Sequence, residues 1–273
     1  MGNDVSLERA GVPERFGIVL SILRQPPYVV TAACALALLA YWTLAGTTPA
    51  IVTHLWKWFP ALLGGLLVNI EISVLAMLLG TLVGLVVGAV SLSPVGTIRG
   101  ATRWYVLFFR NSPILILIYF TTYVFPFEIS VYSWVFPFPD WIKVVIGLGL
   151  PASANVAEIF RGAIQSIPSA QWESAQSLGF SRAQIFRIVV LPQCVRRMLP
   201  SWMNLYAGIT MSTSLASLVG VHDVVEMATV ASNTVARTDF TILIYFTLLA
   251  LFFAYCYPIA RMTRSLERRY DHQ

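Results

Sequence analysis

The run 61-ALLGGLLVNIEISVLAMLLGTLVGLVVGAVSL-92 decides the fold class of this chain. A helix needs roughly 20 apolar residues to cross a hydrocarbon core about 30 Å thick, and this run is longer than that. Its apolar residues are continuous rather than alternating, which excludes the strands of a closed membrane barrel. A span is predicted to begin near Ile70, because Asn69 and Glu71 suit the boundary. The run therefore predicts a transmembrane helix.

The composition of the whole chain extends this prediction. Hydrophobic residues make up 57% of its 273 residues and charged residues 11%, with a mean hydropathy of +0.73. Soluble domains carry about 25% charged residues, so a soluble globular protein is excluded, and so is a disordered chain. The predicted fold class is an all-α, polytopic helical bundle with six transmembrane helices: Val29–Leu44, a helix within Ala61–Leu92, Tyr105–Phe125, Ile142–Phe160, Met198–Val219 and Phe240–Ile259.

The basic residues predict the orientation of the spans. Of 18 Lys and Arg residues, 15 fall on the side that holds both termini, and only Lys57, Lys143 and Arg237 fall on the other. Short cytoplasmic segments carry the excess of basic residues, so both termini are expected in the cytoplasm. This bias accounts for the pI of about 9.3 without a nucleic-acid surface. The aromatic outer segment Phe125–Trp141 is either an interfacial hairpin or part of a docking rim for an external partner.

The sequence offers no metal or nucleotide site. Its three cysteines have no paired spacing, and the three histidines, His54, His222 and His272, are scattered outside the predicted spans. A G-x-x-x-x-G-K-[ST] loop, which would hold nucleotide phosphates, is absent from the sequence. An intramembrane hydrolase is disfavoured because no predicted span holds a histidine to serve as the base.

The longest predicted cytoplasmic segment, residues 161–198, is patterned as two short helices. The first is expected over Ser169–Leu178 and ends at Gly179, a residue typical of helix C-termini. Ser181–Gln184 is a capping box that starts the second helix, and Pro192 is expected to end it. Such a pair also resembles a DNA-reading helix-turn-helix. Because membrane spans tether both of its ends, a groove on a cytoplasmic partner is the favoured receptor.

This segment carries a family resemblance. Glu173-Ser174-Ala175 and Gly179, followed after nine residues by Val189-Val190-Leu191-Pro192, resemble the EAA loop of ATP-binding-cassette importer permeases, E-A-A-x3-G-x9-I-x-L-P, with mild departures at Ser174 and Val189. Ala157–Gly162, Phe109–Pro113 and Thr213–Leu215 are similar to motifs of the polar amino-acid branch of that family, and the resemblance covers about Leu62–Glu267.

The resemblance implies a type I importer transmembrane domain in the bacterial cytoplasmic (inner) membrane. The permease domain is expected over residues 61–267, with coupling helices at 166–192, and residues 1–60 add a cytoplasmic N-terminus and a leading transmembrane helix. The implied function is a permease subunit that forms the translocation path of an ATP-driven amino-acid importer with a second permease chain, either a copy or a sister. An ion-coupled secondary transporter is the alternative; it predicts internal repeats, and none is clear.

The same resemblance implies the partners and the coupling residues. The chain is not an enzyme, and ATP and magnesium are bound by a cytoplasmic ATPase dimer into which the coupling helices insert. An extracytoplasmic amino-acid-binding protein delivers the substrate. The residues expected to couple transport to the ATPase are Glu173, Ala175, Gly179, Leu191 and Pro192.

Polar and helix-breaking residues inside the spans are candidates for the substrate path. They are Asn111, Ser112, Pro113, Asn155, Ser212, Thr213 and Ser214. Small hydroxyl residues also serve simply to pack helices, so both interpretations stay open. Met211-Ser212 stands where relatives often have Lys-Asp, which slightly favours neutral or acidic amino acids over basic ones.

Overall fold

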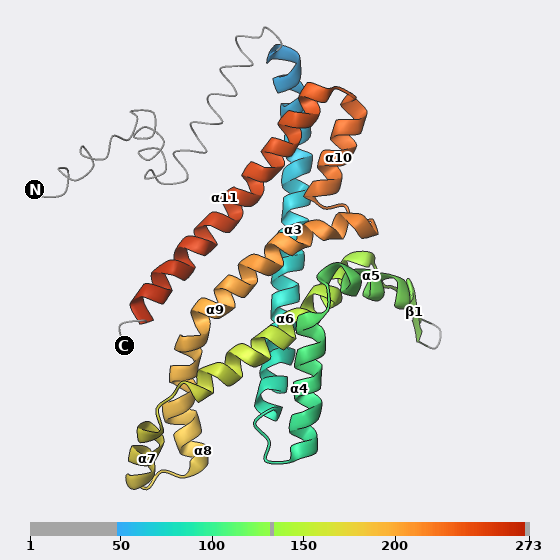
Figure 1. Ribbon diagram of the computed structural model, residues 1–273. Helices are drawn as coiled ribbons and strands as arrows, with labels where there is room; N and C mark the ends of the chain where they lie inside the picture. The colour runs from blue at the N-terminus through green and yellow to red at the C-terminus, as the bar shows by residue number, and fades with distance from the viewer. Residues whose placement is uncertain (1–47, 132–133, 271–273) are drawn as a thin grey trace, which may run out of the picture. The chain divides into compact units, whose positions relative to one another are not determined.

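The computed structural model describes residues 48–131 and 134–270, and the predicted leading span Val29–Leu44 lies outside them (Figure 1). The chain divides into two compact units, residues 1–54 and 55–273, and apart from the first residues of α3 the features described below lie in the second unit. The elements, in chain order, are α3 (Thr48–Val90), α4 (Gly96–Asn111), α5 (Ile114–Val124), β1 (Glu128–Val131), β2 (Trp134–Pro137), α6 (Asp140–Gln165), α7 (Ser169–Ser177), α8 (Arg182–Gln184), the π-helix η2 (Ile185–Val190), α9 (Leu191–Ser212), the 3-10 helix η3 (Thr213–Val219), α10 (Val224–Val235) and α11 (Thr238–Tyr270).

The spans differ from the prediction in two ways. Within the described residues, α3, α6 and α11 are each long and apolar enough to cross a membrane, and the count rises to five if each of two bent pairs is one span. The predicted span Tyr105–Phe125 is bent by 103° between α4 and α5, because Pro113 cannot continue α4 and the residue before a proline favours an extended backbone. The predicted span Met198–Val219 continues past a second bend of 50° into α10.

Helix α3 begins well before the predicted start near Ile70. Its 43 residues run from Thr48 to Val90 with Pro60 inside the helix. At 1.5 Å per residue this helix is about 64 Å long, more than twice the thickness of a hydrocarbon core. The polar pair Asn69 and Glu71 therefore lies in the middle of the helix and not at its beginning.

Three glycines let α3 and α6 approach closely. A Cβ atom on Gly80 would lie 2.6 Å from the Cβ of Ala152, one on Gly84 would lie 2.6 Å from the Val156 Cβ, and one on Gly88 would lie 2.8 Å from the Phe160 ring. Small residues at this four-residue spacing are typical of tightly packed membrane helices. The main buried cluster forms around this contact, with Ile72, Met77, Ile118, Leu148 and Ile209 among its members.

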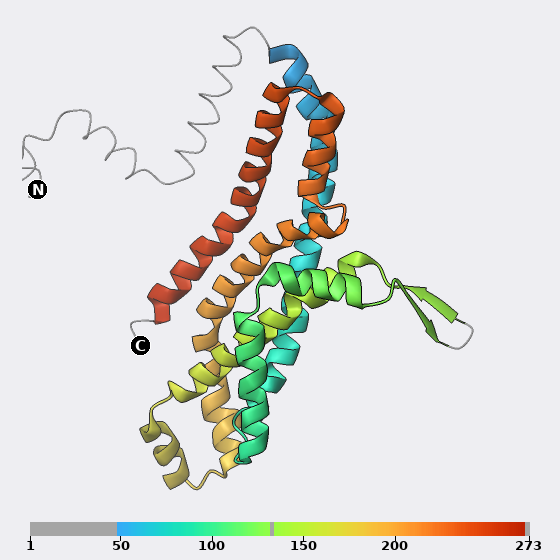
Figure 2. The same ribbon diagram turned by 45° about the vertical axis from the view of Figure 1, so that its right-hand side comes forward.

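The aromatic segment, predicted to lie outside, forms a two-stranded antiparallel hairpin, with Glu128 opposite Pro137. It projects from the helices beyond the end of α5 (Figure 2). The buried Lys143 secures its base, because the ammonium group donates to Asp140 Oδ1 at 3.0 Å and lies 3.7 Å from the centroid of the Phe127 ring. A hairpin is thus confirmed, whereas its place at the membrane interface and its alternative role as a docking rim both stay predictions.

Candidate functional site

The turn after α7 is built as the sequence predicts. Gly179 has a φ of +81°, a conformation in which a residue with a Cβ is strained. The Gly179 N–H donates to Gln176 O at 3.0 Å and the Phe180 N–H to Ala175 O at 3.2 Å. These two bonds are the Schellman motif, which satisfies the last carbonyls of a helix. The predicted end of the first coupling helix is confirmed.

The predicted capping box is also confirmed. Ser181 Oγ accepts the Gln184 N–H at 3.4 Å, and Gln184 Oε1 accepts the Ser181 N–H at 2.8 Å. The two side chains satisfy donors at the start of the second helix. A second helix therefore begins at Arg182, three residues after Gly179.

The prediction that Pro192 ends the second helix is wrong. The helix runs from Arg182 through the π-helix η2 into α9, and Pro192 is one of the first residues of α9. A π turn widens the helix and shifts its hydrogen-bond register by one residue, so a residue that lacks an N–H is accommodated there. The second coupling helix is therefore continuous with a membrane-spanning helix.

A buried cluster fastens this coupling segment, residues 166–192, to the spans. Its members come from the end of α6, from the link to α7, from α7 and from the η2–α9 helix: Phe160, Ala163, Ile167, Ala175, Ile185, Val190, Cys194 and Met198, with Leu191 packed against them. Gln193 Nε2 donates to Gln171 Oε1 at 2.5 Å, and Arg197 Nη1 donates to Ser166 O at 2.8 Å. The segment is therefore packed against the end of α6 and against α9.

The face of the coupling segment that points away from the buried cluster is exposed. Leu178 is 76% exposed, and Glu173, Gly179 and Pro192 are exposed as well. Among the described residues, no hydrogen-bond or ion-pair partner exists for the Glu173 carboxylate. Two of the five predicted coupling residues, Ala175 and Leu191, thus hold the segment, and the other three lie at its surface.

The predicted substrate-path residues bond mainly within their own helices. At the end of α4, Asn111 Nδ2 donates to Leu107 O at 2.6 Å and Ser112 Oγ donates to Phe108 O at 2.7 Å, next to the bend at Pro113. Asn155 Nδ2 donates to Pro151 O at 2.8 Å.

The residues near the end of α9 behave in the same way. Ser212 Oγ donates to Gly208 O, and Ser214 Oγ donates to Met211 O, each at 2.9 Å. Across the described residues, no hydrogen bond joins the three groups, near 111, 155 and 212, to one another. Glu158 pairs with Arg161 along α6, as the spacing predicts.

A buried polar network, which the sequence did not reveal, joins α3 to the break between η3 and α10. Asn69, Thr213 and Asp223 are all fully buried. Asn69 Nδ2 donates to Thr213 Oγ1 and to Asp223 Oδ2, both at 3.0 Å, and Asn69 Oδ1 accepts the Val224 N–H at 3.0 Å. The predicted path residue Thr213 therefore uses its hydroxyl in a contact between helices. The one local signal for this network is Asp223, a residue typical of helix N-caps, whose Oδ1 accepts the Glu226 N–H. No residue near Asn69 in the sequence indicates that Asn69 takes part.

A glycine makes room for that network. A Cβ on Gly65 would lie 2.6 Å from the backbone of Val224, whereas a Cβ on Gly64 would meet no atom within 4 Å. The first turn of α10 thus lies directly on α3.

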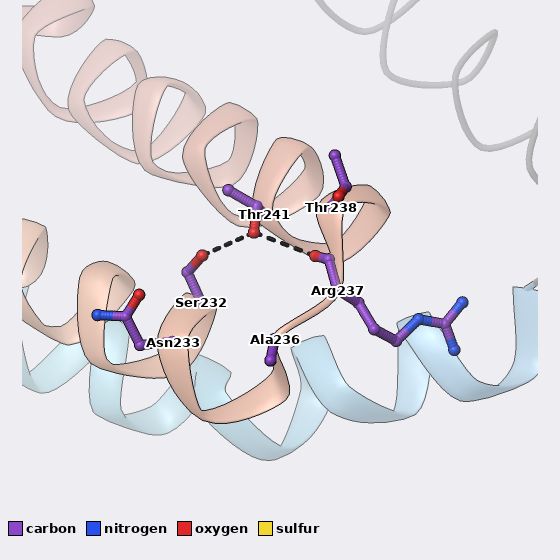
Figure 3. Close-up of a pocket in the computed structure, with 6 residues that line it drawn as sticks. All are labelled: Ser232, Asn233, Ala236, Arg237, Thr238 and Thr241. Carbon is purple, nitrogen blue, oxygen red and sulfur yellow. Dashed lines mark hydrogen bonds between the residues drawn. The ribbon is translucent and has the colours of Figure 1, made fainter.

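A small polar hollow of about 350 Å³ lies at the turn between α10 and α11 (Figure 3). Ser232 Oγ and Thr241 Oγ1 lie 2.7 Å apart, and Thr241 Oγ1 donates to Arg237 O at 3.0 Å. The Arg237 guanidinium is bound by Asp239, and this hydrogen bond raises the pKa of Arg237 above its ordinary value. The hollow contains none of the predicted substrate-path residues, and its one cation is already paired.

Comparisons with known families and with individual proteins all identify transport-system membrane components as similar to this chain. Residues 80–272 match the family described as the binding-protein-dependent transport system inner membrane component. The chain is similar to a probable amino-acid ABC transporter permease protein of Bacillus subtilis (strain 168), with 31% identity over 78% of this chain and 91% of the relative. It is also similar to an octopine transport system permease protein of Rhizobium radiobacter, with 30% identity over 78% of this chain and 87% of the relative.

Among solved structures, the fold is similar to that of an amino acid ABC transporter with histidines, at a TM-score of 0.66 and 24% identity over 79% of this chain and 96% of that chain. At this identity the likeness concerns the fold alone. The arrangement of helices is thus similar to one found in another transport protein.

Proposed function

The chain belongs to the family of binding-protein-dependent transport system inner membrane components, and from this premise we propose that it is the permease subunit of an ATP-driven amino-acid importer. With a second permease chain it forms the translocation path. The amino-acid substrate class is supported by the relatives, which are named as amino-acid and octopine permeases. The family description supports a binding protein as the source of the substrate and the inner membrane as the location.

The single observation that carries this proposal is the construction of the coupling segment. One side of it is locked to α6 and α9 by a buried cluster, and the other side is exposed with an unpaired carboxylate at Glu173. Such a compact helical pair fits a groove on a partner. In this role Glu173 and Pro192 contact the ATPase subunit, Gly179 sets the angle between the two helices, and Ala175 and Leu191 pass movement to the spans.

The energy source lies in the partner. The sequence has no phosphate-binding loop, so ATP and magnesium are held by a pair of cytoplasmic ATPase subunits and the chain itself is not an enzyme. Both termini then lie in the cytoplasm, with the hairpin β1–β2 outside. In this proposal residues 61–267 form the permease domain, and residues 1–60 add the predicted leading helix.

The substrate path is proposed along the polar residues of the two bent spans and α6. Asn111, Ser112 and Pro113 lie at the 103° bend between α4 and α5, where the chain cannot complete its backbone hydrogen bonds as a regular helix does. Asn155 is half-buried on α6, and Ser212 and Ser214 are half-buried at the change from α9 to η3. The Thr213 hydroxyl accepts a hydrogen bond from Asn69 Nδ2, which joins this region to α3.

The test is reconstitution of the complete transporter. The chain is co-expressed with the ATPase, permease and binding protein of its neighbouring reading frames, purified through a tag on this chain, and placed in vesicles. We expect the ATPase to copurify and a labelled amino acid to enter only with ATP and the binding protein present. Uptake driven by an ion gradient without ATP would contradict the proposal and favour a secondary transporter.

A further inference from the structure

Arg110 is a cation without a partner in the last turn of α4. Its side chain is exposed, and no hydrogen bond or ion pair joins the guanidinium to any residue that the structure describes. The sequence counts this charge with the cytoplasmic ones, yet the residue falls inside the predicted span Tyr105–Phe125. Its depth follows from the contacts that the chain makes on either side of it.

Two contacts with α6 place Arg110 inside the membrane. Before it, the Tyr105 hydroxyl lies 2.7 Å from Ser153 Oγ. After the bend, a Cβ on Gly147 would lie 3.0 Å from the backbone of α5. Helix α6 is long and apolar enough to cross a membrane; at 1.5 Å per residue it continues for about 18 Å after Ser153 and begins about 10 Å before Gly147. Arg110 lies between the two contacts along the chain, so it is in the interior of the span.

The face of α4 that carries Arg110 is basic along its length. Arg99, Arg103 and Arg110 are spaced by four and seven residues, which places them on one side of a helix. All three side chains are exposed and have no printed sequence neighbour or distant residue as an ionic partner within the described part of the chain. Val106 lies in the same row and is buried, so the row runs beside a contact within the protein. Charged side chains at membrane depth ordinarily face a partner or a water-filled path, and a basic row beside packed helices fits a path.

The polar groups next to Arg110 leave it as the donor at the bend. Asn111 Nδ2 and Ser112 Oγ already donate to carbonyl groups of α4, and Pro113 has no N–H. The negative end of the α4 dipole favours a cation here, but it engages none of the guanidinium N–H groups. A guanidinium offers five N–H donors in a planar fork that matches a carboxylate.

We propose that Arg110 binds the carboxylate of the amino acid as the substrate passes the bend between α4 and α5, and that it is a specificity-determining residue of the path. The inference rests on the proposed function, because the substrate class supplies the anion. A lipid phosphate lies at the membrane interface and not in the hydrocarbon core, so it does not reach this depth. The site accepts amino acids with different side chains and discriminates against analogues whose carboxylate is a carboxamide.

The first test is uptake by the complete transporter, reconstituted with its binding protein in vesicles. The probe is a radiolabelled mixture of the twenty common amino acids. We expect Arg110→Gln to lower uptake at least tenfold. Arg110→Lys keeps the charge but loses the planar fork, so it should lower uptake about threefold. Arg103→Gln, on the same face but nearer the start of α4, is the matched control and should stay within twofold of the parent.

A second measurement separates recognition of the carboxylate from a structural role. A cysteine replaces Asn111 in a chain whose three native cysteines are changed to serine, and Arg110 is kept. In the purified transporter without the binding protein, the amino-acid mixture should slow the reaction of this cysteine with a water-soluble thiol reagent at least fivefold. The carboxamides of the same amino acids should not slow it. This measurement decides the matter even if Arg110→Gln fails to accumulate.

Three results would overturn the inference. They are uptake by Arg110→Gln within twofold of the parent, equal protection of the cysteine by amino acids and by carboxamides, and the absence of any protection. Uptake by the parent separates this inference from the proposed function. A parent that imports no amino acid would refute the proposed function and this inference with it, whereas a parent that imports amino acids beside an unimpaired Arg110→Gln would refute this inference alone.

Discussion

Two breaks in the helical chain have the same local chemistry but different roles in the protein. At the coupling turn, Gly179 has a φ of +81° and Ser181 caps the next helix; at the η3–α10 break, Gly220 has a φ of +84° and Asp223 caps the next helix. The coupling turn is exposed, and its bonds span only a few residues. At the η3–α10 break Val221 and Asp223 are buried, and Thr213 and Asp223 are bonded to Asn69, more than 140 residues away in the sequence.

The difference shows how environment decides the role of a break. A turn that is closed by its own local bonds keeps its shape while its surface is free to bind a partner. A turn that depends on a distant buried amide is fixed to the rest of the protein. The coupling turn is therefore suited to transmit movement, and the η3–α10 break is suited to resist it.

The largest expected effect is at the buried break. Asn69→Leu leaves the buried Val224 N–H without its partner and takes one hydrogen bond each from Asp223 and Thr213, which keep their bonds to Glu226 and Thr210. An unsatisfied buried polar group costs about 1–3 kcal/mol. We expect a loss of about 3 kcal/mol in the free energy of unfolding, measured by thermal unfolding in detergent. Asn204→Leu is the control, because Asn204 is exposed on α9 and has no hydrogen bond to a described residue. Equal melting temperatures for the two variants would remove the distinction between the breaks.

A smaller loss of stability is expected when Gly65, which packs against the first turn of α10, is replaced. Gly65→Ala places a Cβ 2.6 Å from the Val224 backbone, whereas Gly64→Ala meets no atom within 4 Å. Overpacking of this kind costs about 1–3 kcal/mol, so only Gly65→Ala should unfold at a lower temperature. If Gly64→Ala destabilises the protein as much, the close approach of α10 to α3 is not what holds the break.

The two breaks also show how far the sequence can be interpreted. Gly179 and the Ser181–Gln184 box were predicted correctly, because caps depend on residues that are neighbours in the sequence. The sequence places Asn69 at the predicted start of a span, since nothing near it indicates a partner at Asp223. The prediction that the second helix ends at Pro192 was wrong for a related reason. No recognisable residue in the sequence indicates the π turn that accommodates this proline.

A substitution in the coupling turn should lower the rate of transport more than it lowers the stability of the protein. Gly179→Val imposes a β-branched side chain on a left-handed backbone, at a cost of about 1–2 kcal/mol. Its Cβ has open space around it, so the chain should still fold, but the angle between α7 and α8 changes and uptake falls at least tenfold. Gly179→Asn, which tolerates this backbone, should keep most of the uptake. Normal uptake by Gly179→Val would mean that the turn has no part in coupling.

The smallest effects are expected along the proposed path. Asn155→Leu and Ser212→Leu remove polar groups that bond only their own helices, so the melting temperature should be unchanged. Each should lower uptake about fivefold, the equivalent of one hydrogen bond of about 1 kcal/mol. Uptake at the parent rate in both variants would show that these residues pack helices and that the binding protein alone selects the substrate.

The central claim is that the exposed face of the coupling segment binds an ATPase subunit, and a cross-link measures it most directly. A single cysteine replaces Leu178, which is 76% exposed, after the three native cysteines are changed to serine. A short thiol-to-amine cross-linker in the complete transporter should then join this chain to the ATPase subunit. Glu173→Lys should reduce the yield at least fivefold, and a cysteine at Thr238, in the α10–α11 turn, should give no such product. Absence of the product from Leu178→Cys, or equal yields from the two positions, would contradict the account.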